Sequence, residues 1–88
     1  MASSTLDPLT AQRALEVLDE LVTYQRKRVR EIACRIHPGL TDEDLRNVHD
    51  FPKVYGDPMF QFEDGQLAGF VAAQIALKAH LLGGTLPS

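Results

Sequence analysis

The architecture of this chain follows from residues 8–36, which read PLTAQRALEVLDELVTYQRKRVREIACRI. No proline or glycine interrupts the segment after Pro8, and its apolar positions recur at alternating steps of four and three residues. This spacing places one stripe of side chains along a helix, as in the seam of a coiled coil. The stripe consists of Ala11, Leu15, Leu18, Val22, Gln25, Val29, Ile32 and Ile36.

Both ends of this helix carry sequence signals. Asp7 is a favourable N-cap residue, and Pro8 suits the first helical position because its missing N–H needs no partner there. At the other end, Pro38 pushes His37 out of the helical region. We therefore expect a helix from about Pro8 to Ile36, on the order of 43 Å long at about 1.5 Å per residue.

A second helix is expected over residues 58–82. Asp57-Pro58 repeats the cap-and-proline start, and Gly83-Gly84 ends the pattern. One side carries the large apolar residues Phe60, Leu67, Phe70, Leu77 and Leu81, with Gln74 among them. Another side carries only small residues at the same spacing, namely Gly65, Gly69, Ala72, Ala76 and Ala79. A helix that is apolar nearly all round is typically buried on most sides.

The connector between the two helices, residues 37–57, is too long for a simple helical turn. Thr41 and Asp44 have the spacing of a capping box, with Asp44 in place of the usual Glu or Gln, so we expect a short helix over about 42–47. The residues that follow mix apolar and polar side chains. They predict an extended segment that is anchored by Val48, Phe51, Val54 and Tyr55.

These elements define an all-α protein: a long antiparallel helical hairpin with a structured connector that contains one short helix. At 88 residues the chain has no room for a second core, so it forms one domain. We assign residues 1–6 to a disordered leader, 7–84 to the helical domain and 85–88 to a tail. A chain of this size buries only about 60% of its unfolded surface, so its stability is marginal unless something adds burial.

The helix over 58–82 has two apolar faces, and one neighbouring helix covers only one of them. We expect a homodimer in which two hairpins form a four-helix bundle, with the dimer interface at Gly65, Gly69, Ala72, Ala76 and Ala79. The alternative is that the connector folds back over this face. The helix over 8–36 is acidic in its first half and basic in its second, which suits antiparallel pairing of two copies and equally suits the helix dipole.

Two amides, Gln25 and Gln74, interrupt otherwise apolar seams. A polar residue at such a position fixes register or oligomeric state when its side chain finds a partner. The two amides can pair with each other, pair with their copies in a dimer, or reach solvent at the edge of the stripe.

Few residues point to catalysis or metal binding. Cys34 and His37 share one helical turn but lack the second ligand pair of a structural zinc site. His49-Asp50 has no nucleophile at a recognisable spacing, and the chain contains no glycine-rich phosphate loop. The sequence therefore predicts a protein that is not an enzyme, with no catalytic residues, no metal site and no cofactor.

The sequence favours a protein-interaction or structural module that acts through its surface. A protein partner of unknown identity is expected at the connector, where His49, Lys53 and Tyr55 combine aromatic and polar groups. The formal net charge of −3 argues against nucleic acid as the main partner. The alternative function is a nucleic-acid-binding helical protein that uses the basic run at residues 26–30.

The sequence also bears on where the protein acts. Cys34 is the only cysteine, and the N-terminal residues lack the pattern of a secretory signal, so we expect a cytoplasmic protein. The longest apolar stretch, residues 67–82, is shorter than the roughly 20 residues needed to cross a bilayer. We expect no association with a membrane.

Overall fold

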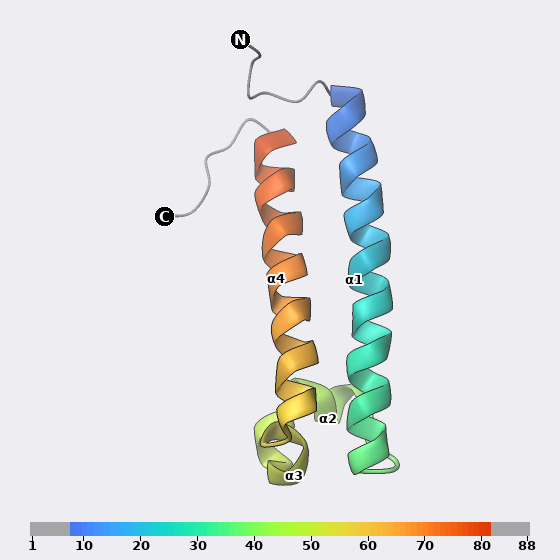
Figure 1. The fold of residues 1–88 in the computed structure, drawn as a ribbon, viewed down its shortest axis with the longest axis vertical. Coiled ribbons are helices and arrows are strands. Elements are labelled where there is room, and N and C mark those ends of the chain that lie inside the picture. Colours follow the sequence, from blue (N-terminus) through green and yellow to red (C-terminus); the bar gives the residue numbers. More distant parts are fainter. Residues whose placement is uncertain (1–7, 82–88) are drawn as a thin grey trace.

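Two long antiparallel helices, α1 (Pro8–Ile36) and α4 (Pro58–Leu81), dominate the computed structural model, which describes residues 8–81 (Figure 1). The start of α1 and the end of α4 lie at one end of the hairpin, and the connector lies at the other. No β-strand occurs within residues 8–81. The predicted all-α hairpin and the bounds of its first helix are confirmed. The leader (1–6), the tail (85–88), Asp7 and Gly83-Gly84 lie outside the described residues.

The predicted seam along α1 is confirmed by burial. Ala11, Val22, Gln25, Val29 and Ile32 are buried, and Leu15, Leu18 and Ile36 are half-buried. The seam positions of α4 follow the same alternating spacing: Phe60, Glu63, Leu67, Phe70, Gln74, Leu77 and Leu81. Among the described residues of α4, only Phe60 and Glu63 are fully buried. The two helices therefore pack most tightly near the connector.

The connector contains three helical turns where one was predicted: α2 (Asp42–Arg46), η1 (Val48–Asp50, a 3₁₀ turn) and α3 (Pro52–Tyr55). The prediction of an extended segment after residue 47 is wrong. Pro52 occupies the first turn of α3, and the carbonyl of Phe51 accepts the backbone N–H groups of Val54 and Tyr55 at 3.0 and 2.9 Å. Proline at this position favours a helical start because its φ is already set.

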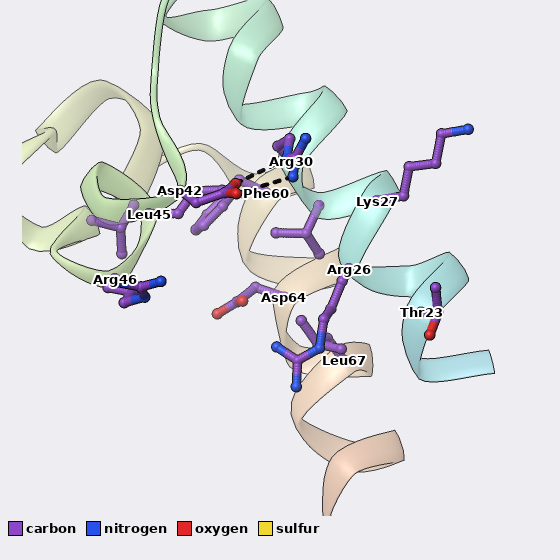
Figure 2. Close-up of a pocket in the computed structure, with 12 residues that line it drawn as sticks. Thr23, Arg26, Lys27, Arg30, Asp42, Leu45, Arg46, Phe60, Asp64 and Leu67 are labelled. Carbon is purple, nitrogen blue, oxygen red and sulfur yellow. Dashed lines mark hydrogen bonds and ion pairs between the residues drawn. The ribbon is translucent and has the colours of Figure 1, made fainter. Parts of the chain in front are cut away.

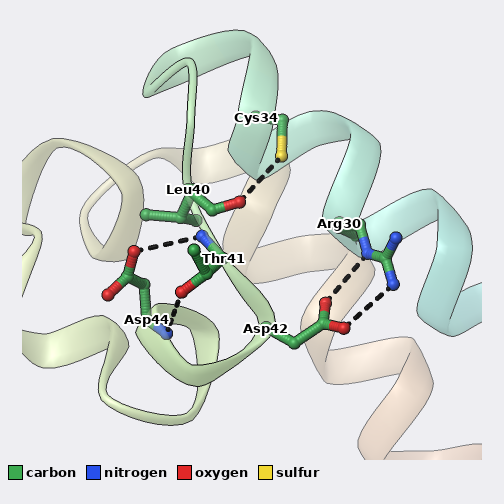
Figure 3. Close-up of polar contacts among 6 residues, drawn as sticks. All are labelled: Arg30, Cys34, Leu40, Thr41, Asp42 and Asp44. Atoms are coloured by element: carbon green, nitrogen blue, oxygen red, sulfur yellow. Dashed lines mark hydrogen bonds and ion pairs between the residues drawn. The ribbon is translucent and has the colours of Figure 1, made fainter.

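The predicted capping box at the start of α2 is confirmed (Figure 3). The backbone N–H of Asp44 donates to Thr41 Oγ1 at 3.1 Å, and the N–H of Thr41 donates to the Asp44 carboxylate at 3.0 Å. Arg30 holds α2 against α1 through both oxygens of Asp42, at 3.0 and 3.1 Å. Gly39 turns the chain between α1 and α2 with a φ of 88°, a conformation that glycine adopts without strain.

The hydrophobic core lies where the connector meets the hairpin. It combines side chains of α1 and α4 with two connector residues in one cluster: Val29, Ile32, Ala33, Leu40, Val54 and Phe60. Val54 is completely buried, whereas Phe51 is half-buried at the edge of this cluster. The connector is thus part of the core, and it fixes the register of α4 on α1.

Candidate functional site

The small-residue positions of α4 lie on the side of the helix that faces away from α1. Gly65, Gly69 and Ala72 are exposed, and Ala76 and Ala79 are half-buried. At 100° per residue they centre roughly opposite the seam. We call this side the outer face of α4 and define it as Phe62, Gly65, Gly69, Ala72, Ala73, Ala76 and Ala79. The alternative that the connector folds back over this face is wrong, because the connector packs at the closed end of the hairpin.

The outer face of α4 is unusually apolar for an exposed surface. Phe62 is 62% exposed, and no Asp, Glu, Lys or Arg occurs between Gly65 and Leu77. A methyl group added to Gly65 or Gly69 would meet no atom within 4 Å, so packing within the chain does not require glycine there. Single exposed apolar residues are ordinary, but a continuous apolar face marks a binding surface.

A flank of α1 extends this apolar surface. Val17, Leu21 and Tyr24 are exposed and follow each other at steps of four and three residues, so they share one side of the helix. Arg28 lies one turn further along the same side, and its Nε is 3.1 Å from Glu63 Oε1 of α4. This flank therefore adjoins α4 at Glu63.

A buried polar cluster joins the two long helices. The side-chain amide of Gln25, which is 3% exposed, donates to the backbone oxygen of Glu63 at 2.9 Å and to Glu63 Oε1 at 2.8 Å. The hydrogen bond from Gln25, followed by that from Arg28, lowers the pKa of the Glu63 carboxyl group. The carboxylate in turn raises the pKa of Arg28. The cluster satisfies its own polar atoms and ties α1 to α4.

The second predicted amide also finds a partner on the opposite helix. Gln74 Nε2 donates to Asp19 Oδ1, so Gln25 and Gln74 do not pair with each other within the chain. Glu63 was missed as the partner of Gln25, although its position between Phe60 and Leu67 matches the seam spacing. The seam spacing was the signal that could have identified Glu63 as a buried acid that needs a hydrogen-bond donor.

The connector residues predicted to bind a partner are all exposed. The rings of His49 and Tyr55 lie side by side with centroids 4.4 Å apart, and Lys53 lies on the same short helix as Tyr55. The backbone oxygen of Tyr55 accepts a hydrogen bond from Gln61 at 2.8 Å, which ties this corner to α4. Partner binding at His49, Lys53 and Tyr55 stays a prediction.

The basic run of α1 is divided between two sides of the hairpin. Arg28 binds Glu63 on one side, whereas Arg26 and Arg30 line a groove on the other side, together with Arg46 of α2 (Figure 2). The positive charges therefore form no single continuous stripe. Arg30 is already paired with Asp42, so only part of the run is available to an external anion.

Cys34 and His37, the weak metal-binding pair of the sequence, each contact another residue. Cys34 Sγ donates to the backbone oxygen of Leu40 at 3.6 Å, and the ring of His37 packs edge-on against Phe51 with centroids 5.0 Å apart. Residues 8–81 contain no group of three or more side chains placed to hold a metal ion.

None of the described helices is long and apolar enough to cross a membrane. Comparison of the chain with protein-family models, curated proteins and solved structures finds no match.

Proposed function

We propose that this protein is a non-enzymatic protein-interaction module that works as a homodimer, in which the outer faces of two α4 helices pack together. The observation that carries the proposal is the outer face itself, which is exposed from Phe62 to Ala73 and has no charged residue between Gly65 and Leu77. Burying this face in a four-helix bundle supplies the burial that a small hairpin lacks.

The glycines of the outer face favour a close partner over solvent. Each glycine inside a helix costs about 1 kcal/mol relative to alanine. Because Gly65 and Gly69 have free space around them, no contact within residues 8–81 offsets that cost. A second helix whose backbone approaches closely at these positions is the natural compensation.

A second copy is a suitable occupant of the outer face, because a two-fold axis across the middle of the hairpin makes the copies antiparallel and pairs this uncharged, small-residue face with an identical one. In such a dimer the two α4 helices lie in the middle and the two α1 helices lie on the outside, so the acidic and basic halves of α1 do not meet across the interface. The exposed connector residues His49 and Tyr55 would then lie at both ends of the dimer, free for a partner protein.

A charge placed on the outer face tests this proposal. Ala72→Glu and Ala76→Glu should each convert the dimer to monomer, because a carboxylate buried in an apolar interface is costly. Gln12→Glu, at an exposed position of α1, is the matched control and should leave the dimer intact. Light scattering after gel filtration measures the mass. A wild-type protein that is monomeric at high micromolar concentration would reject the dimer.

Nucleic-acid binding is the alternative function, and the observation that favours it is the convergence of Arg26, Arg30 and Arg46 on one groove. Two features argue against it. Arg30 is neutralised by Asp42, and Phe60, the only aromatic residue of that lining, is 2% exposed and cannot stack on a base. Nonspecific DNA or RNA should therefore show no measurable binding at physiological salt.

A further inference from the structure

A groove opens where the connector meets both long helices, on a different side from the outer face of α4 (Figure 2). Its volume is about 740 Å³, within the range of about 300–1,000 Å³ that is usual for ligand sites. Its lining combines cationic side chains at the rim with an apolar floor. The residues that matter here are Arg26, Leu45, Arg46, Phe60, Asp64 and Leu67.

Two guanidinium groups at this groove lack a carboxylate partner. Arg26 comes from α1 and Arg46 from α2, and in Figure 2 they lie on either side of Asp64, which comes from α4. Within residues 8–81, neither arginine forms an ion pair, whereas Arg30 is held by Asp42 at 3.0 Å. An unpaired guanidinium group beside an apolar surface is well suited to bind a carboxylate through two parallel hydrogen bonds.

The floor of the groove is aliphatic where a ligand can reach it. Leu45 and Leu67, both half-buried, line it, whereas Val29 and Phe60 are almost completely covered. Such a floor accepts aliphatic side chains and offers no aromatic face for a base. The separation of the two arginines by Asp64 disfavours one compact anion and favours a ligand that carries two carboxylates at a distance from each other.

We infer that this groove binds an acidic amphipathic peptide segment of a partner protein. Arg26 and Arg46 receive carboxylates of the peptide, and Leu45 and Leu67 receive its aliphatic side chains. Asp64 repels carboxylates between the two arginines, so it selects for the spacing of the acidic residues. The groove lies away from the outer face of α4, so this inference stands or fails separately from the proposed dimer.

Fluorescence anisotropy with a labelled peptide of repeating Glu-Leu-Leu-Glu tests the inference. Arg26→Gln and Arg46→Gln should each weaken binding about tenfold, since each removes one charge-assisted pair. Asp64→Asn should tighten binding, because it removes the repulsive carboxylate. Arg35→Gln removes the same charge from an exposed position of α1 outside the groove, and it should leave the affinity within about twofold of wild type.

Three results would overturn the inference. The first is the absence of saturable binding to the acidic peptide. The second is an equal loss of affinity in the Arg26, Arg46 and Arg35 variants, which would show attraction to net charge and not to this groove. The third is tighter binding of an oligo-dT of equal charge, which would assign the groove to nucleic acid. Circular dichroism of each variant checks that helicity is retained, as expected for exposed arginines.

Discussion

The exposed sides of the two long helices differ in chemistry. On α1 the exposed positions are mostly charged, and they include Arg13, Glu16, Glu20, Lys27, Glu31 and Arg35. The outer face of α4 carries glycine, alanine and Phe62, and it has no charged residue from Gly65 to Leu77. The charged side chains of α1 are well hydrated by water, whereas the apolar outer face of α4 is stabilised when another protein surface buries it. The difference supports the proposal that a second copy covers the α4 side of the hairpin, which the apolar flank of α1 at Val17, Leu21 and Tyr24 adjoins.

The largest expected effect is a difference in the free energy of unfolding between variants on the two faces of α4. Phe60→Ala should lower the free energy of unfolding by about 3–5 kcal/mol, because Phe60 is buried in the core. Phe62→Ala should change the free energy of unfolding of the monomer by no more than about 0.5 kcal/mol, because that ring is exposed. Urea denaturation at low protein concentration measures both. Equal losses would show that Phe62 packs within the chain.

A smaller effect is expected at the glycines of the outer face, where substitution should raise the stability of the hairpin and lower the affinity of the dimer. Gly65→Ala and Gly69→Ala should each stabilise the isolated hairpin by about 1 kcal/mol, because the added methyl groups meet nothing within the chain. The same changes should weaken dimerisation, because they keep the partner backbone at a distance.

The matched control for the glycine variants is Gln12→Ala on α1, which is exposed outside the proposed interface. It should leave dimerisation unchanged. Melting curves at low concentration and sedimentation at high concentration separate the two effects. Stabilisation of the hairpin without any loss of dimer would remove the glycines from the interface.

Much of this contrast could be predicted from the sequence. The seam of α1 repeats over many turns, and the small residues of α4 share one spacing, so periodicity alone placed both faces. The turns η1 and α3 could not be predicted, because single helical turns depend on tertiary contacts such as the burial of Val54.

The polar cluster between the helices could also be predicted only in part from the sequence. Gln25 was recognisable as a polar residue in an apolar seam, but the choice of Glu63 as its partner depends on the register between α1 and α4. That register is set by the folded connector. The unpaired guanidinium groups of Arg26 and Arg46 likewise come from two elements that only the fold brings to one groove.

The smallest effect concerns how the two long helices are held together as pH changes. Hydrogen bonds from Gln25 and Arg28 lower the pKa of Glu63 in the folded protein. Their stabilisation is fully present above the unfolded pKa of about 4.3 and is lost as pH falls through the lower folded pKa. Glu63→Gln should therefore reduce the fall in melting temperature between neutral and acid pH. A variant with the same acid dependence as wild type would contradict this role of the carboxylate.

Sedimentation equilibrium of the wild-type protein shows whether a second copy covers the outer face of α4. We expect a mass of two chains at high micromolar concentration, with dissociation to one chain on dilution. The Ala72→Glu variant should remain at one chain throughout that range while keeping its helicity by circular dichroism. A wild-type protein that sediments as a single chain at every concentration, with the same mass as Ala72→Glu, would show that α4 does not mediate a dimer.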